Sequence, residues 1–161
     1  MNLTPDGLTP NTMTALTSRR TSKKIFEMIE PQTALVYTMV MVSAADSEMT
    51  DSEIGRIGEI VSQLPVFSGF DTEQLTDIAR DCAELLSRED GLDDALAQIR
   101  DALPERLRDT AYVLACDIAT ADEKASQEEL RLLEMLRHSL NIQRLTAAAI
   151  ERAARARYAP I

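Results

Sequence analysis

Ala44-Ala45-Asp46-Ser47-Glu48-Met49-Thr50-Asp51-Ser52-Glu53-Ile54 is the stretch that decides the fold, because its pattern recurs 76 residues later. The second copy reads Thr120-Ala121-Asp122-Glu123-Lys124-Ala125-Ser126-Gln127-Glu128-Glu129-Leu130. The matched positions are Asp46 with Asp122, Thr50 with Ser126, Glu53 with Glu129, and Ile54, Ile57 and Ile60 with Leu130, Leu133 and Leu136. An internal repeat of this kind predicts two related halves.

Each copy contains the signature of a helix start. In Thr50-x-x-Glu53 and Ser126-x-x-Glu129 the hydroxyl is placed to accept from the backbone N–H of the glutamate, whose carboxylate reaches back to the first residue. Each copy therefore predicts a helix, a short loop and a new helix.

Asp46 and Asp122 stand where the first helix of each copy is expected to end. A carboxylate is disfavoured there, since the helix dipole favours cations at that end by roughly 0.3–1 kcal/mol. A local rule broken twice at equivalent places points to a function. The alternative is that each Asp closes its own loop as an Asx-turn.

The remaining periodicity predicts an all-α protein, a compact bundle of about 7–9 helices in two pseudo-symmetric halves. The run 32–45 leaves no polar face, which is typical of a helix at the centre of a bundle, and the analogous run 110–121 is expected to be its partner in the core. Residues 1–18 are expected to be a leader or short helix, with a short amphipathic helix near 25–29, and 19–161 a single domain. Amphipathic helices are expected at 50–63, 75–86, 92–103, 126–139 and 143–158.

Charge is unevenly distributed along the chain. Residues 46–134 hold 23 Asp and Glu against 8 Lys and Arg, a net charge of −15, whereas the remainder holds 4 acidic and 9 basic residues. An acidic centre argues against nucleic acid, whose affinity for proteins comes mainly from phosphate contacts. It favours cations or a protein partner with a basic surface.

Familiar catalytic sets have little support. Cys82 and Cys116 lie in apolar helical patterns and are expected to be buried thiols. His138 is the single histidine, so neither a nucleophile triad nor a helical di-metal site built on Glu-x-x-His pairs is expected. The start of the chain has no basic region followed by an apolar one, and the longest apolar run, 34–45, is too short to span a bilayer. We therefore expect a cytoplasmic protein without stable membrane insertion.

Two matched segments carry a likeness to a known family. The first is the apolar helix ending Ser43-Ala44-Ala45-Asp46 with Thr50-Asp51-Ser52-Glu53, and the second is Ala119-Thr120-Ala121-Asp122 with Ser126-Gln127-Glu128-Glu129. Together they resemble the TerB-like domains of tellurite-resistance proteins. The resemblance covers about residues 33–142. It implies an all-helical fold, a stress-response role and a divalent-cation site at the pseudo-twofold.

Carried over by position, the metal ligands that the resemblance implies are Asp46, Glu53, Asp122 and Glu129, and hard oxygen ligands of this kind favour calcium or magnesium. Asp51, Gln127 and Glu128 are expected to be secondary ligands or first-turn residues that suit the helix dipole. The chain differs from the family at Ser47 and Glu123, where a Gly commonly follows the Asp. Neither loop has EF-hand spacing, so an ion would be shared between the halves.

Three functions follow from these patterns. The first is a non-enzymatic binding or scaffold module of the stress-response type, regulated by a cation. The second is a purely structural protein–protein interaction domain whose acids are caps and turns. The third, least supported, is a hydrolase with a carboxylate-bound metal.

Overall fold

A helix that is buried on every side lies at the centre of the fold. In the computed structural model, which describes residues 28–45, 49–121 and 125–161, α1 spans Pro31–Ser43. Every residue from Ala34 to Ser43 is buried. Pro31 occupies the first turn, where its missing N–H costs nothing. The prediction from the unbroken apolar run 32–45 is confirmed.

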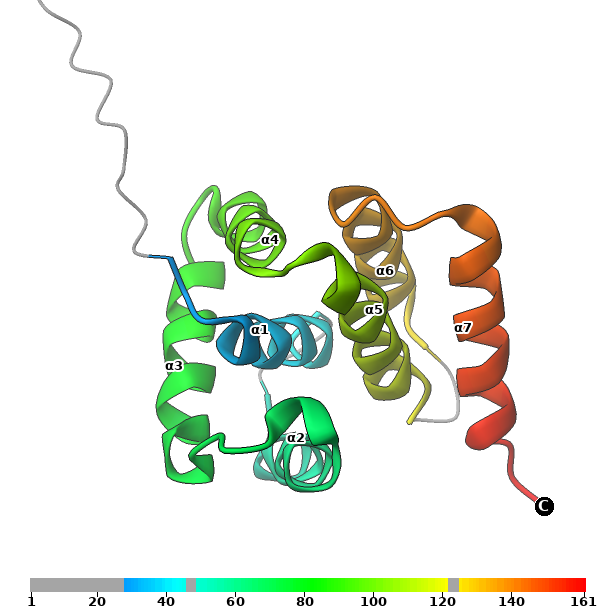
Figure 1. The fold of residues 1–161 in the computed structure, drawn as a ribbon, viewed down its shortest axis with the longest axis horizontal. Coiled ribbons are helices and arrows are strands. Elements are labelled where there is room, and N and C mark those ends of the chain that lie inside the picture. Colours follow the sequence, from blue (N-terminus) through cyan, green and yellow to red (C-terminus); the bar gives the residue numbers. More distant parts are fainter. Residues whose placement is uncertain (1–27, 46–48, 122–124) are drawn as a thin grey trace, which may run out of the picture.

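Six further α-helices and two short 3₁₀ helices follow α1 in the described part of the chain (Figure 1). They are α2 (Asp51–Gln63), η1 (Pro65–Phe67), η2 (Thr72–Gln74), α3 (Leu75–Leu86), α4 (Gly91–Ala102), α5 (Glu105–Thr120), α6 (Gln127–Ser139) and α7 (Arg144–Arg157). The described ranges contain no β-strand, so the all-α prediction is confirmed.

The connector after α2 folds back on the core as its apolar residues predict. Phe67 is buried and meets Phe70 edge to face, with ring centroids 5.8 Å apart. Asp71 accepts a hydrogen bond from the Glu73 backbone N–H and so caps η2. Pro104 is the N-cap residue of α5.

The start of the described chain is not helical. Met28 and Ile29 lie outside any helix, and the rest of the short amphipathic helix predicted near 25–29 lies outside the described residues. Met28 is exposed, whereas Ile29 packs against the core. The leader predicted for residues 1–18 lies outside the described residues.

The second half of the chain is arranged around α5. This helix packs against α1, and both α6 and α7 pack on α5. α6 and α7 make almost no close contact with each other (Figure 1). The two helices therefore stand on α5 as separate walls. No helix within the described residues is long and apolar enough to cross a bilayer.

Candidate functional site

The first capping box is complete. The Thr50 backbone N–H donates to Oε2 of Glu53 over 2.6 Å, and the Thr50 hydroxyl donates to the same oxygen over 2.7 Å. The Glu53 backbone N–H donates to Oγ1 of Thr50 over 3.4 Å. Because these bonds tie the side chain to the helix start, the position of the Glu53 carboxylate is fixed by local sequence.

The second capping box repeats this geometry at α6. The Ser126 backbone N–H donates to Oε2 of Glu129 over 2.7 Å, and the Glu129 N–H donates to Oγ of Ser126 over 3.1 Å. Both capping boxes predicted from the sequence are thus confirmed.

Glu53 and Glu129 line the same small cavity. It has a volume of about 10 Å³ and is completed by Ser43 at the end of α1, Arg56 of α2 and Ile118 of α5. A space of this size is close to the minimum that one water molecule needs. Two of the four predicted ligands, 76 positions apart in the chain, are therefore brought to one point.

Electrostatics around Glu53 favour its ionised form. Burial opposes ionisation, but hydrogen bonds from the Thr50 backbone and hydroxyl and from Ser43, together with the nearby Arg56 guanidinium, lower the pKa of the Glu53 carboxyl. The carboxylate is therefore charged at neutral pH, as a ligand for a hard cation must be.

The fit of these residues to a metal ion is partial. Calcium takes six to eight oxygen ligands, whereas the cavity offers two glutamates and a guanidinium that already brings positive charge. Within the described parts of the chain, no three His, Cys, Asp or Glu side chains are grouped closely enough to hold an ion. Asp46 and Asp122 lie outside those parts.

The predicted secondary ligands do not line this cavity. Asp51, Gln127 and Glu128 occupy the first turns of α2 and α6 and are exposed. Acidic residues in a first turn are stabilised by the helix dipole. Their position agrees with that simpler role.

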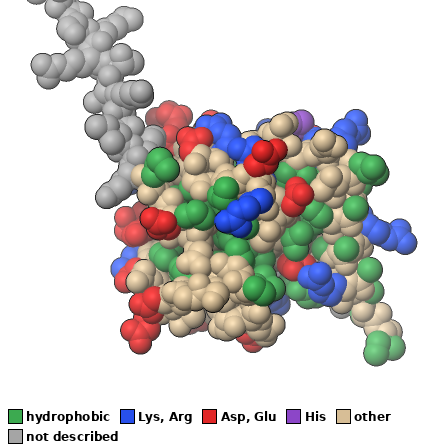
Figure 2. Space-filling model, in the orientation of Figure 1, with side chains coloured by type: hydrophobic (Ala, Val, Ile, Leu, Met, Phe, Trp, Pro, Cys, Tyr) green, Lys and Arg blue, Asp and Glu red, His purple; other side chains and the backbone are tan. Residues whose placement is uncertain are grey.

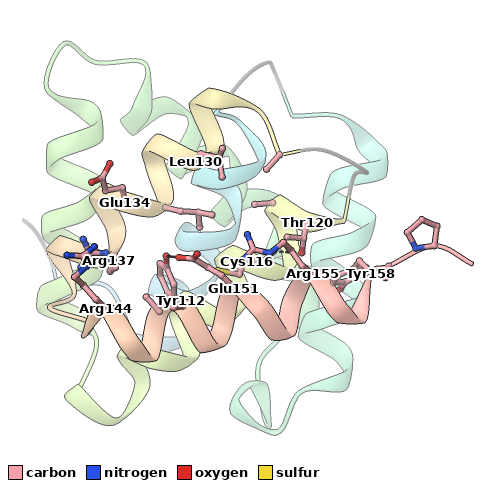
Figure 3. Close-up of a pocket in the computed structure, with 17 residues that line it drawn as sticks. Tyr112, Cys116, Thr120, Leu130, Glu134, Arg137, Arg144, Glu151, Arg155 and Tyr158 are labelled. Carbon is pink, nitrogen blue, oxygen red and sulfur yellow. Dashed lines mark hydrogen bonds between the residues drawn. The ribbon is translucent and has the colours of Figure 1, made fainter.

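A much larger hollow, which no sequence pattern indicated, lies over α5 between α6 and α7 (Figure 3). This groove has a volume of about 1070 Å³. On its floor the Tyr112 hydroxyl donates to Oε1 of Glu151 over 2.7 Å. Burial, and then the bond to Glu151, raise the pKa of Tyr112, so the phenol remains a donor.

The cysteines and the histidine are placed as their surroundings in the sequence predict. Cys82 and Cys116 are free and buried, and burial raises the pKa of each thiol to about 12. His138 is exposed, and its ring nitrogen lies 2.8 Å from the Arg137 guanidinium. A thiol with such a pKa is a poor nucleophile at neutral pH.

Local sequence carries little sign of the groove. Tyr112 and Glu151 are 39 residues apart, and each fits its own helical pattern. The only available signal is the spacing Tyr112, Cys116, Thr120, which places three polar or polarisable side chains along one face of α5.

Comparison with known families gives one clear result. A model of the family described as tellurite resistance protein TerB matches residues 32–153, most of the chain and nearly the same span as the resemblance noted in the sequence. No significant match was found among curated proteins or solved structures. Together with the all-helical fold, the match shows that this chain belongs to the TerB family of tellurite resistance proteins.

Proposed function

We propose that this TerB-family protein is a non-enzymatic binding module whose two halves share one divalent-cation site, formed by Asp46, Glu53, Asp122 and Glu129. The observation that supports it is the meeting of Glu53 and Glu129 at one cavity between α2 and α6. The capping boxes hold both carboxylates at helix starts, and each aspartate comes shortly before one of these starts in the sequence. Calcium or magnesium suits this set of oxygen ligands.

The positive charge of Arg56 affects how the proposed site would bind a cation. Its guanidinium lines the same cavity and favours the ionised form of Glu53. A cation that binds here must either displace the Arg56 guanidinium or bind beside it, so the affinity for the ion depends on the position of Arg56. We expect weak binding, in the range of a regulated site rather than of a permanent structural ion.

The experiment is a calorimetric titration of calcium and of magnesium into metal-stripped protein. The proposal expects saturable binding that is lost in Asp46→Asn/Asp122→Asn. The control is Asp81→Asn/Glu84→Gln, which removes the same charge from the exposed face of α3. Absence of binding by the natural chain up to about 10⁻³ M ion, the weakest class of protein calcium site, contradicts the cation site.

The purely structural alternative has its own signature. If the acids are only caps and turns, Asp46→Ala/Asp122→Ala should lose about 1 kcal/mol of stability for each lost cap or turn and show no change in ion binding. A direct reaction with tellurite is not part of the proposal, because both thiols are buried. Turnover of tellurite by the purified protein with a simple thiol reductant would contradict the non-enzymatic role.

The partner we propose is a protein with a basic surface. Acidic side chains gather on the α3 side of the molecule, whereas several basic ones lie on the α7 side (Figure 2). Asp77, Asp81 and Glu84 are exposed along α3. Attraction between oppositely charged surfaces weakens as salt shortens the Debye length, so binding of such a partner should fall steeply with ionic strength.

A further inference from the structure

The groove over α5 is bounded on all sides but one. α5 forms its floor, α6 and α7 form its walls, and the walls are joined at one end by the short connection between them. At the opposite end the connection before α6 contributes Ala125, and the residues after α7 contribute Tyr158, Ala159 and Pro160. A trough with lining residues at both ends suits a ligand of limited length better than a helix that runs through it.

The dimensions of the groove set the size of that ligand. From Arg144 to Arg155 the wall formed by α7 extends about 16 Å, at about 1.5 Å per residue. The volume of about 1070 Å³ is at the upper end of pockets that hold small molecules.

The lining is apolar over most of its length. Leu130 and Leu133 line the α6 wall and Ala147 and Ala148 the α7 wall, with Ala119 on the floor. Leu130 is 46% exposed although it sits in an apolar helical pattern. An unbranched hydrocarbon chain would cover these side chains and remove their surface from water.

Basic side chains lie at the ends of the groove. Arg137 at the end of α6 and Arg144 at the start of α7 lie close to each other at one end, and Arg155 lies toward the other (Figure 3). None of the three forms an ion pair with a carboxylate within the described parts of the chain. Of the two glutamates in the lining, Glu151 is bonded to Tyr112 and lies between the two ends, whereas Glu134 lies at the same end as Arg137 (Figure 3).

We propose that this groove binds a small amphiphilic anion, an unbranched apolar chain that ends in a carboxylate. The carboxylate lies between Arg137 and Arg144, and the chain runs along α5 toward Tyr158. The side chains match each part of such a ligand: guanidinium groups bind a carboxylate through paired N–H donors, and the leucines and alanines cover the chain. This site lies over α5, α6 and α7, and it does not depend on the cation site.

The test uses the full chain and calorimetric titration of octanoate, decanoate and dodecanoate, with EDTA present to separate the result from any cation. We expect one ligand per protein and an affinity that rises about fourfold per buried methylene until the chain fills the groove. Absence of saturable binding of all three, or binding of many copies without dependence on chain length, overturns the proposal.

Two matched pairs of variants locate the ligand. Arg137→Gln/Arg144→Gln should weaken decanoate about tenfold or more while leaving uncharged decanol unchanged, since it removes charge-assisted hydrogen bonds to the head group. Arg131→Gln/Arg152→Gln removes the same charge from exposed positions of α6 and α7 outside the groove and should leave decanoate binding unchanged. Equal losses in both double variants overturn the assignment of the head group.

The second pair of variants tests the effect of filling the groove with a large side chain. Ala148 and Ala149 are neighbours on α7 and both exposed, but only Ala148 lines the groove. Ala148→Trp should abolish binding of decanoate and decanol, and Ala149→Trp should not. Thermal unfolding of each variant without ligand reports whether the fold is retained, and binding that survives a folded Ala148→Trp places the ligand elsewhere and overturns the proposal.

Discussion

Arg157 donates from one nitrogen, Nη1, to both carboxylate oxygens of Asp117, over 2.7 Å and 2.6 Å. The contact joins the end of α7 to the last turns of α5. Asp117 is only 8% exposed, so its carboxylate depends on this partner in place of water. The pair holds in place the helix that forms one wall of the groove.

Removing the guanidinium should therefore destabilise the fold. Arg157→Gln leaves a nearly buried carboxylate without its cation, and we expect the free energy of unfolding to fall by about 1–2 kcal/mol, a moderate value because Arg157 itself is half-exposed. Urea unfolding measures the change. Arg152→Gln, on the exposed face of the same helix, should stay within about 0.5 kcal/mol of the natural chain; an equal effect of both variants would refute the role of the ion pair.

The same carboxyl should give stability a recognisable pH dependence. Burial raises the pKa of Asp117 above its ordinary value of 3.8, although Arg157 opposes the rise. The folded state then binds this proton more tightly than the unfolded state, so the contribution of Asp117 to stability falls as pH rises from below 3.8 through the raised pKa. Stability of Asp117→Asn, followed across that window by denaturant unfolding, should lack this decline. A parallel pH profile for the two proteins contradicts the prediction.

Glu53 should change stability with pH in the direction opposite to that of Asp117. Its carboxyl pKa is lowered below 4.5, because hydrogen bonds from Thr50 and Ser43 and the charge of Arg56 outweigh its burial. Stability from the capping box is therefore present above pH 4.5 and lost as pH falls through the lowered pKa. The gap in unfolding free energy between the natural chain and Glu53→Gln should close in that acid range. Glu59→Gln, which removes a charge from the exposed face of α2, serves as the control.

Neither thiol should react with a disulfide reagent in the native protein. Cys82 donates from Sγ to the carbonyl oxygen of Tyr37 over 3.8 Å, and both cysteines are almost fully buried. With pKa values of about 12, they should not react with a disulfide reagent at pH 8 in the native state and should both react in urea. Rapid labelling of the folded chain would show that the thiols are accessible.

Two glycines should respond to alanine in opposite directions. A Cβ added at Gly91 would overlap the carbonyl oxygen of Leu85, so Gly91→Ala should cost about 1–3 kcal/mol. A Cβ at Gly55 meets nothing within 4 Å, and Gly55→Ala should add roughly 0.5–1 kcal/mol by favouring helix α2. Thermal unfolding of the two variants measures both changes, and destabilisation by Gly55→Ala would contradict the geometry.

Local chemistry made much of this fold predictable. The apolar run at 32–45 could be placed at the centre because no polar face was available to meet water. The capping boxes could be predicted to the residue, since the bonds of Thr50 and Ser126 span only three positions. The meeting of Glu53 with Glu129 agrees with the repeat, although Arg56 in the same cavity had no sequence signal.

The groove could not be predicted, because it lies where α6 and α7 do not pack against each other. Leu130 was matched with Ile54 by the repeat, and the pattern alone does not say that α7 stands away from α6. The Tyr112–Glu151 and Asp117–Arg157 contacts join residues 39 and 40 positions apart, beyond the reach of helical periodicity. Only the way the helices pack brings such pairs together.

The central position of α1 also determines when the protein can finish folding during its synthesis. The surface of α1 is covered mainly by α3, α4 and α5, all of which follow it in the chain. While the ribosome is still making residues 105–120, one side of an entirely apolar helix has no partner within the nascent polypeptide. Such a segment attracts chaperones and other incomplete chains. Folding of this protein is therefore completed late, when α5 emerges and covers α1, which precedes it in the chain.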